Sequence, residues 1–519
     1  MNRSTRTLRG IATRLTAGLA LALGAIVALS SCTLVSVTEP PRLTSTPTGE
    51  PVASDLQSYY SQELTWRECH RGLQCAIAKA PLDWSDPQRD EIELSLIRHT
   101  ASNPIGSLLI NPGGPGGSGV EIVRDSLRYV VSDRLIANFD IVGFDPRGVG
   151  SSSAIRCASR DEDLDRFLYQ YEVGDPERGS DEWLDEGRAE WRELGEACLE
   201  HSGELLGYVD TTSAARDLDL LRAILGDEQL HYLGYSYGTL LGASFAELYP
   251  ERAGRLVLDG ALDPATSLDD VVEFQSVGFE NALRAYLESC LEGARCPFRG
   301  TAEAGMQRVA ALMSQLDRSP LRAPDGRLLG ASTMFTAIIL PLYSADTWSY
   351  LDDLFASVFS GDPEFAFVLA DAYNDRDSDG NYANNSSEAF WAINCLDYVN
   401  TATNDEVRAS TDRLVTVSPL FGPYMGYDTS CDGWPYPATR ERGPIHAVGA
   451  PPIIVIGTTG DPATPYEWAV NLADQLESGQ LVTFDGEGHT AYNKSNRCVN
   501  NAVDEFFING TLPTADLRC

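Results

Sequence analysis

The chain contains the five-residue pattern Gly234-Tyr235-Ser236-Tyr237-Gly238, directly after the apolar run 230–233. A G-x-S-x-G pattern between a strand and a helix is typical of a nucleophile elbow, where small residues permit a sharp, strained turn that exposes the serine hydroxyl. A helix-like stretch, 239–249, follows the pattern and ends at Pro250. The alternative is an ordinary glycine- and serine-containing turn. We interpret the pattern as a strand–turn–helix unit with Ser236 as the candidate nucleophile.

Short apolar runs predict the core of the fold. Seven runs read as buried strands: 92–97, 107–110, 139–144, 230–233, 255–258, 452–456 and 481–484. Several are apolar nearly throughout, as expected for parallel strands covered on both faces. A helical pattern at 213–225 places Ala214, Leu218 and Leu221 on one face and stops at Gly226. This alternation predicts an α/β fold, a mainly parallel sheet with helices on both faces.

The alternation breaks between residues 260 and 450. This region has helical stretches at 271–291, 302–316 and 344–359 and no convincing series of strands. We expect an α/β core formed by 61–260 and 451–519, with a large, mostly helical cap, 261–450, inserted between core strands. An acidic loop at 375–381 resembles part of a calcium loop. It lacks the last glutamate ligand of an EF-hand, which favours a solvated loop.

Composition excludes some functions. The 519 residues are 43% hydrophobic, which is ample for a large core, and carry a net charge of -36 with a pI near 4.4. A chain this acidic repels nucleic acid and anionic lipid head groups, so no nucleic-acid partner is expected. The charge does not define a substrate.

The N-terminus indicates export. An arginine-rich segment precedes the apolar stretch 19–29, as in a secretory signal peptide, and Leu29-Ser30-Ser31-Cys32 resembles the lipobox of bacterial lipoproteins. We therefore expect a signal peptide at 1–31, lipidation of Cys32, a Pro/Thr/Ser-rich tether at 32–60, and an extracellular protein that is anchored or secreted. The alternative is an ordinary signal peptide with an incidental cysteine. No later run of 18 apolar residues predicts a membrane span.

Ten cysteines remain when Cys32 is set aside, an even number that predicts five disulfides in an exported protein. Spacing does not fix the connectivity. The simplest pairing joins neighbours along the chain: Cys69–Cys75, Cys157–Cys198, Cys290–Cys296, Cys395–Cys431 and Cys498–Cys519. A metal site is disfavoured because no C-x-x-C pair with a second ligand pair is present.

A nucleophilic serine needs a base, and the base needs an orienting acid. Among six histidines, His489 stands in a glycine-flanked turn after the strand 481–484, where the order Ser, Asp, His of α/β hydrolases places the base. Asp461 follows the strand 452–456 and lies between the two in sequence. Alone it would read as an Asp-Pro turn residue. In this order on these elements, Ser236, Asp461 and His489 are better explained as a triad.

An oxyanion needs backbone N–H donors, and Tyr237, the residue after the nucleophile, supplies one. A glycine-rich loop, 109–119, follows an early strand and is the candidate for the second donor. A phosphate-binding loop is disfavoured because the run lacks G-K-[ST] and because Pro115 removes a donor. The loop resembles the H-G-G-P-G loop of proline iminopeptidases, with Pro112 in the place of the histidine. That match implies Gly114 as the donor.

Together these features resemble the α/β-hydrolase superfamily, and more closely the secreted tripeptidyl aminopeptidases and proline iminopeptidase-like enzymes of actinobacteria. Four further segments carry the resemblance: FDPRGVGSS at 144–152, TTSAARDL at 211–218, LDGALDP at 258–264 and AINCLD at 392–397. The match covers nearly the whole chain after residue 66. The resemblance implies a monomeric enzyme without cofactor that removes short N-terminal peptides.

An exopeptidase of this kind must bind a free α-ammonium group and so needs carboxylates near the junction of cap and core. Through the motif match, Asp397 is the first candidate. Glu388 and Asp263 are weaker, and each is more often a solvated surface acid. Tyr235 and Tyr237 are expected to line the pocket, although packing alone could account for both.

Two other functions remain open. A carboxylesterase or lipase would use the same triad, so the triad does not discriminate between ester and peptide substrates. A surface-binding lipoprotein on a silent hydrolase scaffold is disfavoured because the triad and the oxyanion loop are intact. An epoxide hydrolase or dehalogenase is disfavoured because those enzymes place aspartate at the elbow.

Overall fold

The structure, a computed structural model, describes residues 43–519 except 170–175 and 440–441. The expected signal peptide and Cys32 lie outside the described residues. Within them, no helix is both long and apolar enough to cross a membrane.

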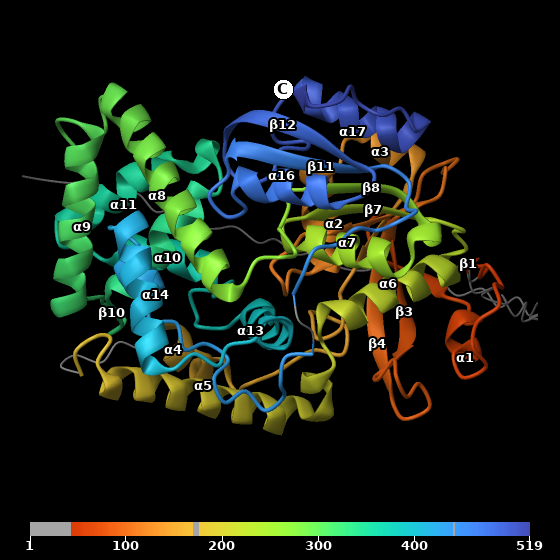
Figure 1. Cartoon of the computed structure of the whole chain (residues 1–519), viewed down its shortest axis with the longest axis horizontal. Helices are drawn as coiled ribbons and strands as arrows, with labels where there is room; N and C mark the ends of the chain where they lie inside the picture. The colour runs from red at the N-terminus through yellow and green to blue at the C-terminus, as the bar shows by residue number, and fades with distance from the viewer. Residues whose placement is uncertain (1–42, 170–175, 440–441) are drawn as a thin grey trace, which may run out of the picture. The chain divides into compact units, whose positions relative to one another are not determined.

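An eleven-stranded sheet runs through the described residues (Figure 1). In spatial order its strands are β1 (Leu43–Thr44), β2 (Thr65–His70), β3 (Leu73–Pro81), β4 (Glu91–His99), β6 (Asp140–Phe144), β5 (Ser107–Asn111), β7 (Leu230–Tyr235), β8 (Ala253–Asp259), β11 (Ile453–Gly460), β12 (Gly479–Glu487) and β13 (Leu517–Arg518).

The strands from β6 to β13 pair in parallel, and those from β1 to β4 pair antiparallel, with β4 antiparallel to β6. Each of the seven runs expected to be strands overlaps a strand of the sheet. The antiparallel strands β2 and β3 were not foreseen. Because β5, β7, β8, β11 and β12 are parallel, their carboxyl ends meet at one edge of the sheet, and the loops that follow them are brought together there.

Helices cover both faces of the sheet. One hydrophobic cluster is built on α6 (Thr211–Leu225), α7 (Tyr237–Leu248) and α16 (Tyr466–Gln475), and a second on α2 (Gly119–Val130), α3 (Asp133–Asn138) and α17 (Arg497–Asn509). Strand residues alternate between the two clusters: Leu109 of β5 packs in the first, whereas Leu108 and Ile110 pack in the second. Both faces of β5 are therefore buried, which explains its uniformly apolar sequence.

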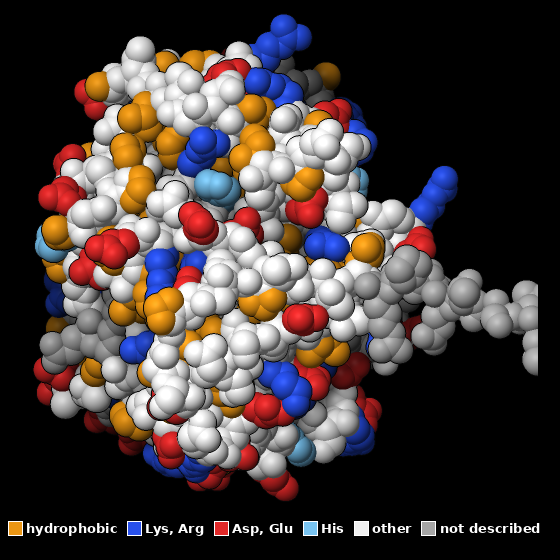
Figure 2. All heavy atoms as spheres, turned by 90° about the vertical axis from the view of Figure 1, so that its right-hand side faces the viewer, with side chains coloured by type: hydrophobic (Ala, Val, Ile, Leu, Met, Phe, Trp, Pro, Cys, Tyr) orange, Lys and Arg blue, Asp and Glu red, His pale blue; other side chains and the backbone are white. Residues whose placement is uncertain are grey.

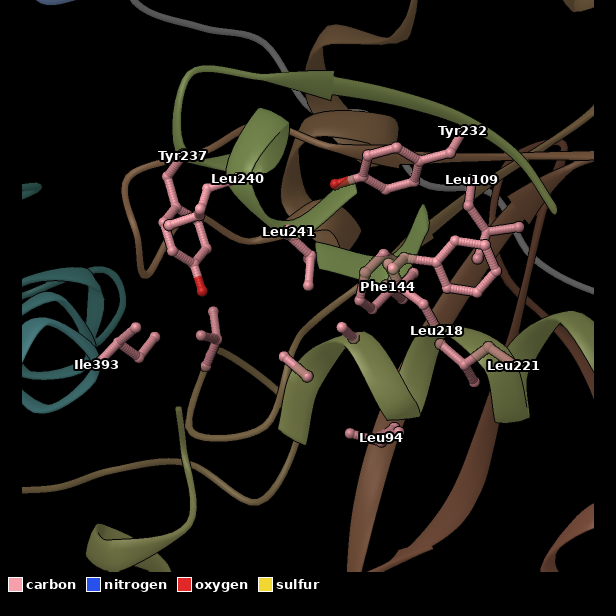
Figure 3. Close-up of a cluster of buried hydrophobic side chains, with 14 of the residues drawn as sticks. Leu94, Leu109, Phe144, Leu218, Leu221, Tyr232, Tyr237, Leu240, Leu241 and Ile393 are labelled. Atoms are coloured by element: carbon pink, nitrogen blue, oxygen red, sulfur yellow. The ribbon is translucent and has the colours of Figure 1, made fainter. Parts of the chain in front are cut away.

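Figure 3 shows part of the first cluster. Tyr237, Leu240 and Leu241 of α7 lie together with Leu218 and Leu221 of α6 and with Ile393, which comes from the region between β8 and β11. The helix that carries the elbow is thus held by apolar contacts on the sheet side and at the edge of the cap.

The region between β8 and β11 is mostly helical and has a hydrophobic cluster of its own. Its helices are α8 (Leu268–Glu292), α9 (Ala302–Arg318), α10 (Ala331–Leu342), α11 (Ser349–Phe359), α12 (Glu364–Tyr373), α13 (Ser386–Asp397), α14 (Asn404–Val417) and α15 (Gly422–Met425). It also contains a small hairpin, β9 (Leu321–Arg322) with β10 (Leu328–Leu329), that the sequence did not predict. A mainly parallel sheet covered on both faces, with a helical cap inserted between core strands, is the α/β-hydrolase fold.

Two helices that precede the elbow pack against the cap. They are α4 (Asp161–Tyr169) and α5 (Asp181–Ser202), and Figure 1 shows α5 beneath α13 and α14. Tyr169 belongs to the cap cluster. Arg188 of α5 donates to the Ala402 carbonyl at 2.8 Å and pairs with Asp432. The cap is therefore built from two separate stretches of the chain.

Residues 43–60, expected to belong to a tether, lie against the body instead. Leu43–Thr44 pairs with β2, and Glu50 forms an ion pair at 2.7 Å with the fully buried Arg222. The short helix α1 (Gln57–Tyr60) is anchored by the Tyr60 hydroxyl, which donates to Asp219 at 2.6 Å. The Pro/Thr/Ser-rich composition misled here because these contacts are made by residues distant in sequence.

Five disulfides join the cysteines as nearest neighbours along the chain, in the simplest pairing considered from the sequence. On the face in Figure 2, acidic and basic side chains are interspersed. The negative charge of the chain is therefore not gathered into one patch on this face.

Candidate active site

Ser236 stands between β7 and α7, as the elbow pattern predicts. Its φ of 54° lies in the left-handed region that side-chain-bearing residues rarely adopt. Its backbone N–H donates to the Asp259 carbonyl at 2.9 Å, which fixes the turn to the end of β8. A Cβ atom at Gly234 would lie 2.3 Å from the Gly238 carbonyl oxygen, so the first glycine of the pattern is required by close packing.

The structure brings His489 and Asp461 together. His489 Nδ1 lies 2.9 Å from both carboxylate oxygens of Asp461, whose side chain is fully buried. A carboxylate only accepts, so Nδ1 is the donor and Nε2 is left with the lone pair that a general base needs. Asp461 also accepts from the Thr464 backbone N–H at 2.9 Å and from the Thr490 N–H at 3.2 Å. These donors fix the carboxylate in place.

Ser236 and His489 both lie beside the end of β8. Ser236 is bonded to the Asp259 carbonyl, and the next residue, Gly260, is so close to His489 that an added Cβ would lie 3.1 Å from the imidazole Cε1. The order Ser236, Asp461, His489 along the chain thus becomes a cluster at the carboxyl edge of the sheet.

The glycine-rich loop lies directly against the nucleophile. A Cβ atom at Gly113 would come within 2.8 Å of the Ser236 Cβ and 3.2 Å of the Tyr237 backbone nitrogen. The Gly113 N–H is engaged by the Asn111 side-chain oxygen at 2.9 Å. Within the part of the chain that the structure describes, the Gly114 N–H donates to no protein group. Gly114 and Tyr237 are therefore suited to bind an oxyanion formed at Ser236.

Asp259 is a site residue that the sequence analysis did not single out. Its buried carboxylate accepts from the backbone N–H groups of Ala491 at 3.0 Å and Tyr492 at 2.8 Å. Burial raises the pKa of Asp259, while these N–H groups and the Lys494 ammonium oppose the rise. Its side chain thus holds the loop after His489, and its carbonyl holds Ser236. The sequence signal that could have identified Asp259 is its position as an acidic residue directly after the apolar residues Leu256 to Leu258 of β8.

The cap contacts each of the three loops that carry the site. Gln275 of α8 donates to the Ala463 carbonyl at 2.9 Å, beside Asp461. The carbonyl of Tyr343, which follows α10, accepts from the His489 N–H at 2.8 Å, and the two rings meet edge to face with centroids 5.5 Å apart. A Cβ atom at Gly116 of the glycine-rich loop would lie 3.1 Å from the backbone nitrogen of Phe390 on α13. No sequence signal identified Tyr343.

The three carboxylates proposed to bind an ammonium group are buried, so the alternative that Glu388 and Asp263 are solvated surface acids is wrong. Asp263 accepts from Asn471 at 2.9 Å and Gln475 at 2.8 Å. Glu388 accepts from the Cys157 backbone N–H and lies 3.6 Å from an Arg156 nitrogen.

Asp397 accepts from both the backbone N–H, at 3.0 Å, and the hydroxyl of Thr211. Burial raises its pKa to about 6. All three carboxylates thus have protein partners.

Tyr235 and Tyr237 are explained by packing and not by exposure in a pocket. Each side chain is buried, and the Tyr235 hydroxyl donates to the Val130 carbonyl at 2.6 Å. The acidic loop at 375–381 folds on itself, with the Asp377 carboxylate accepting the backbone N–H groups of Asp379 and Asn381. Among the described residues, no group of three or more His, Cys, Asp or Glu side chains is placed to hold a metal ion.

Comparison with known proteins finds relatives that are named as hydrolases. A family model described as TAP-like protein matches residues 418–519. The chain is 35% identical to the serine protease Hip1 of Mycobacterium tuberculosis over 484 residues, 88% of this chain and 91% of the relative. It is 36% identical to a carboxylesterase B of the same species over 508 residues, 95% of each chain.

The chain is also 29% identical to a tripeptidyl aminopeptidase of Streptomyces lividans over 487 residues, 88% of this chain and 86% of the relative. The relatives carry the names of a protease, an esterase and an aminopeptidase, which share serine hydrolase chemistry. With this fold, the chain is a serine hydrolase and belongs to the tripeptidyl aminopeptidase-like family of actinobacterial α/β hydrolases.

Proposed function

We propose that this serine hydrolase is an exopeptidase that releases short peptides from the N-terminus of peptide substrates. The observation that carries the proposal is the contact of the cap with all three loops of the site: α8 beside Asp461, Tyr343 on His489 and α13 on the glycine-rich loop. A cap that borders the site at three loops favours a chain end over an internal segment of a folded protein as the substrate. The named protease and aminopeptidase relatives support peptides as substrates.

In the proposed mechanism, His489 accepts the serine proton as Ser236 attacks the scissile carbonyl carbon. Asp461 holds the imidazole in the required tautomer and stabilises its cation, and the N–H groups of Gly114 and Tyr237 stabilise the oxyanion. His489 then protonates the leaving amine, and water, deprotonated by the same histidine, hydrolyses the acyl-enzyme. The products are the released N-terminal peptide and the shortened substrate.

Export and anchoring are part of the proposal. They rest on the arginine-rich and apolar N-terminus and on the lipobox-like Leu29-Ser30-Ser31-Cys32. Five disulfides are consistent with an oxidising compartment. Metabolic labelling with a fatty-acid probe should mark the full chain in its host and should not mark the Cys32→Ser variant. Labelling of both would show that Cys32 is not the lipidated residue.

The substrate class is tested with four compounds: a free-amine tripeptide anilide, its N-acetylated form, a proline anilide and a short-chain nitrophenyl ester. We expect cleavage of the free tripeptide anilide and loss of that cleavage on acetylation, because an exopeptidase must recognise the ammonium group. The Ser236→Ala variant is the matched control and should cleave none of them.

The second candidate function is a carboxylesterase, favoured by the match to carboxylesterase B along 95% of the chain. Hydrolysis of the nitrophenyl ester without hydrolysis of any anilide would support it and would contradict the exopeptidase. Equal cleavage of the free and acetylated peptides would contradict recognition of the N-terminus.

A further inference from the structure

A chain of three buried polar side chains links the cap to the nucleophile elbow. Asp397 is the last residue of α13, Thr211 the first of α6 and Tyr237 the first of α7. The Thr211 hydroxyl donates to Asp397 and lies 2.6 Å from the Tyr237 hydroxyl, and the Thr211 backbone N–H donates to the other Asp397 oxygen at 3.0 Å. All three residues are at most 4% exposed.

The direction of these hydrogen bonds follows from the chemistry of the groups. An ionised carboxylate only accepts, so the single proton of the Thr211 hydroxyl points to Asp397. The Thr211 oxygen is then left as an acceptor, and the Tyr237 hydroxyl must donate to it. As long as Asp397 is charged, the hydroxyl protons of Thr211 and Tyr237 therefore each have one acceptor.

Tyr237 is the residue whose backbone N–H faces the site. Its nitrogen lies 3.2 Å from the position of a Cβ on Gly113, next to the oxyanion loop. Its ring packs in the cluster near Ile393 of α13 (Figure 3), and its hydroxyl is tied to Thr211. An oxyanion donor acts over a narrow range of distances, so a ring that is fixed at its far end also fixes the first turn of α7.

We propose that Asp397 is a positioning residue that acts through Thr211 on Tyr237, so that cap helix α13 helps to hold the oxyanion donor in place. The inference rests on the proposed catalytic role of Ser236. It gives Asp397 a function other than binding of the substrate ammonium group. The three hydrogen-bonded side chains come from α13, α6 and α7, which meet only in the folded protein. Through them, the cap contacts the helix that carries the oxyanion donor.

The charge of Asp397 depends on its neighbours. Burial raises its pKa to about 6, although the two hydrogen bonds from Thr211 oppose the rise; Asp210, the N-cap of α6, adds to it, and Arg442 also opposes it. Among the described residues, the hydrogen bonds that join the Tyr237 hydroxyl to Asp397 run through Thr211. A proton on Asp397 would be donated to the Thr211 oxygen, and either the Thr211 or the Tyr237 hydroxyl proton would then lack an acceptor among these three side chains. Activity should therefore contain a component that is lost as the pH falls through about 6.

The test compares Asp397→Asn, Thr211→Val and Tyr237→Phe with the native chain on a nitrophenyl ester, together with the melting temperature of each. We expect kcat to fall by about 10-fold or more, with KM within about twofold, because oxyanion stabilisation acts in the transition state. Thr211→Ser keeps the hydroxyl and should restore kcat. Thr212→Val, the same change one residue on, is the matched control and should leave kcat unchanged.

A double variant of Asp397 and Tyr237 distinguishes a positioning role of Asp397 from a general loss of protein stability. If Asp397 acts through Tyr237, the double variant Asp397→Asn/Tyr237→Phe is no slower than the slower single variant. The Asp397→Asn profile of kcat against pH should also lack the component near pH 6. Tyr237→Phe is the mildest change and keeps the test decisive if Asp397→Asn does not fold.

Three results would overturn the inference: additive losses in the double variant, a change in KM alone, or equal losses in Thr211→Ser and Thr211→Val. An ester substrate makes this outcome independent of the exopeptidase proposal, because both substrates need the oxyanion donor. Failure of the free tripeptide anilide alone would therefore count against the proposed function and not against the positioning role.

Discussion

Ser236 and Gly113 lie directly against each other in the site. The serine has a φ of 54°, and a Cβ on Gly113 would lie 2.8 Å from its Cβ and 2.6 Å from the Tyr235 carbonyl oxygen. The strained serine is thus held between the end of β8 and a loop that has no room for a side chain. The chemistry therefore depends on the missing Cβ of Gly113 as well as on the hydroxyl of Ser236.

Gly113→Ala should therefore lower kcat by about 100-fold or more, because the added methyl displaces the elbow or the oxyanion loop. Gly326→Ala is the matched control: its φ of 98° is almost the same as the 99° of Gly113, and a Cβ there would meet no atom within 4 Å. The control should cost about 1–2 kcal/mol of stability from backbone strain and leave kcat near that of the native chain. Equal kcat in both variants would show that the close contact at Gly113 has no catalytic role.

At the scale of elements, β7 carries a buried histidine as well as the elbow. His231 Nδ1 accepts from the Arg255 backbone N–H at 3.1 Å, and its ring meets Phe139 edge to face. Burial, and to a lesser extent Arg255, lowers the pKa of His231 to about 4. The folded chain therefore holds this histidine neutral where the unfolded chain protonates it.

The sign of the effect on stability follows from proton binding. Between pH 6.5 and about 4 the unfolded state binds the proton and the folded state does not, so stability is lost as the pH falls through this window. The full shift in the pKa of His231 corresponds to about 3 kcal/mol in the free energy of unfolding. We expect the melting temperature of His231→Gln to depend less on pH between 7 and 4 than that of the native chain. The exposed His70→Gln is the control, and an equal slope in both variants would contradict the account.

The sequence predicted the parallel strands and the order of the triad elements because their signals are local. Each predicted parallel strand contains an apolar run, and the elbow pattern, Asp461 and His489 follow three such strands closely, whereas the two-residue parallel strand β13 was not predicted. Strand β3 was missed because its pattern is inverted: the buried positions hold the small side chains of Ala76, Ala78 and Ala80, whereas Ile77 is 56% exposed. Hydrophobic periodicity cannot detect a strand of this kind.

At the scale of the whole molecule, the parts that sequence reasoning did not find are contacts between distant segments. Asp397 was identified by its motif, but its partner Thr211 lies 186 residues away. Helix α5 was assigned to the core because it precedes the elbow, yet Arg188 bonds to the cap. Such pairings depend on how the cap lies on the sheet, and local patterns do not encode this.

Disulfides also act at this scale. The Cys395–Cys431 bridge closes a loop 36 residues long at the end of α13, whereas Cys69–Cys75 closes one of 6. Since the entropy removed from the unfolded chain grows with loop length, replacing the first pair by serine should cost about 4 kcal/mol and the second about 2 kcal/mol. Urea unfolding of the two double variants measures the difference. A larger loss for the short loop would contradict this ranking.

The central claim is that Ser236 is the nucleophile and that His489 activates it. The most direct measurement is reaction of the full chain with a fluorophosphonate probe, followed by mass spectrometry of the labelled peptide. We predict one adduct per chain, on Ser236, with no labelling of Ser236→Ala and labelling slowed by several orders of magnitude in His489→Ala, about the loss expected when a triad base is removed. Labelling on another serine, or undiminished labelling of folded His489→Ala, would contradict the assignment.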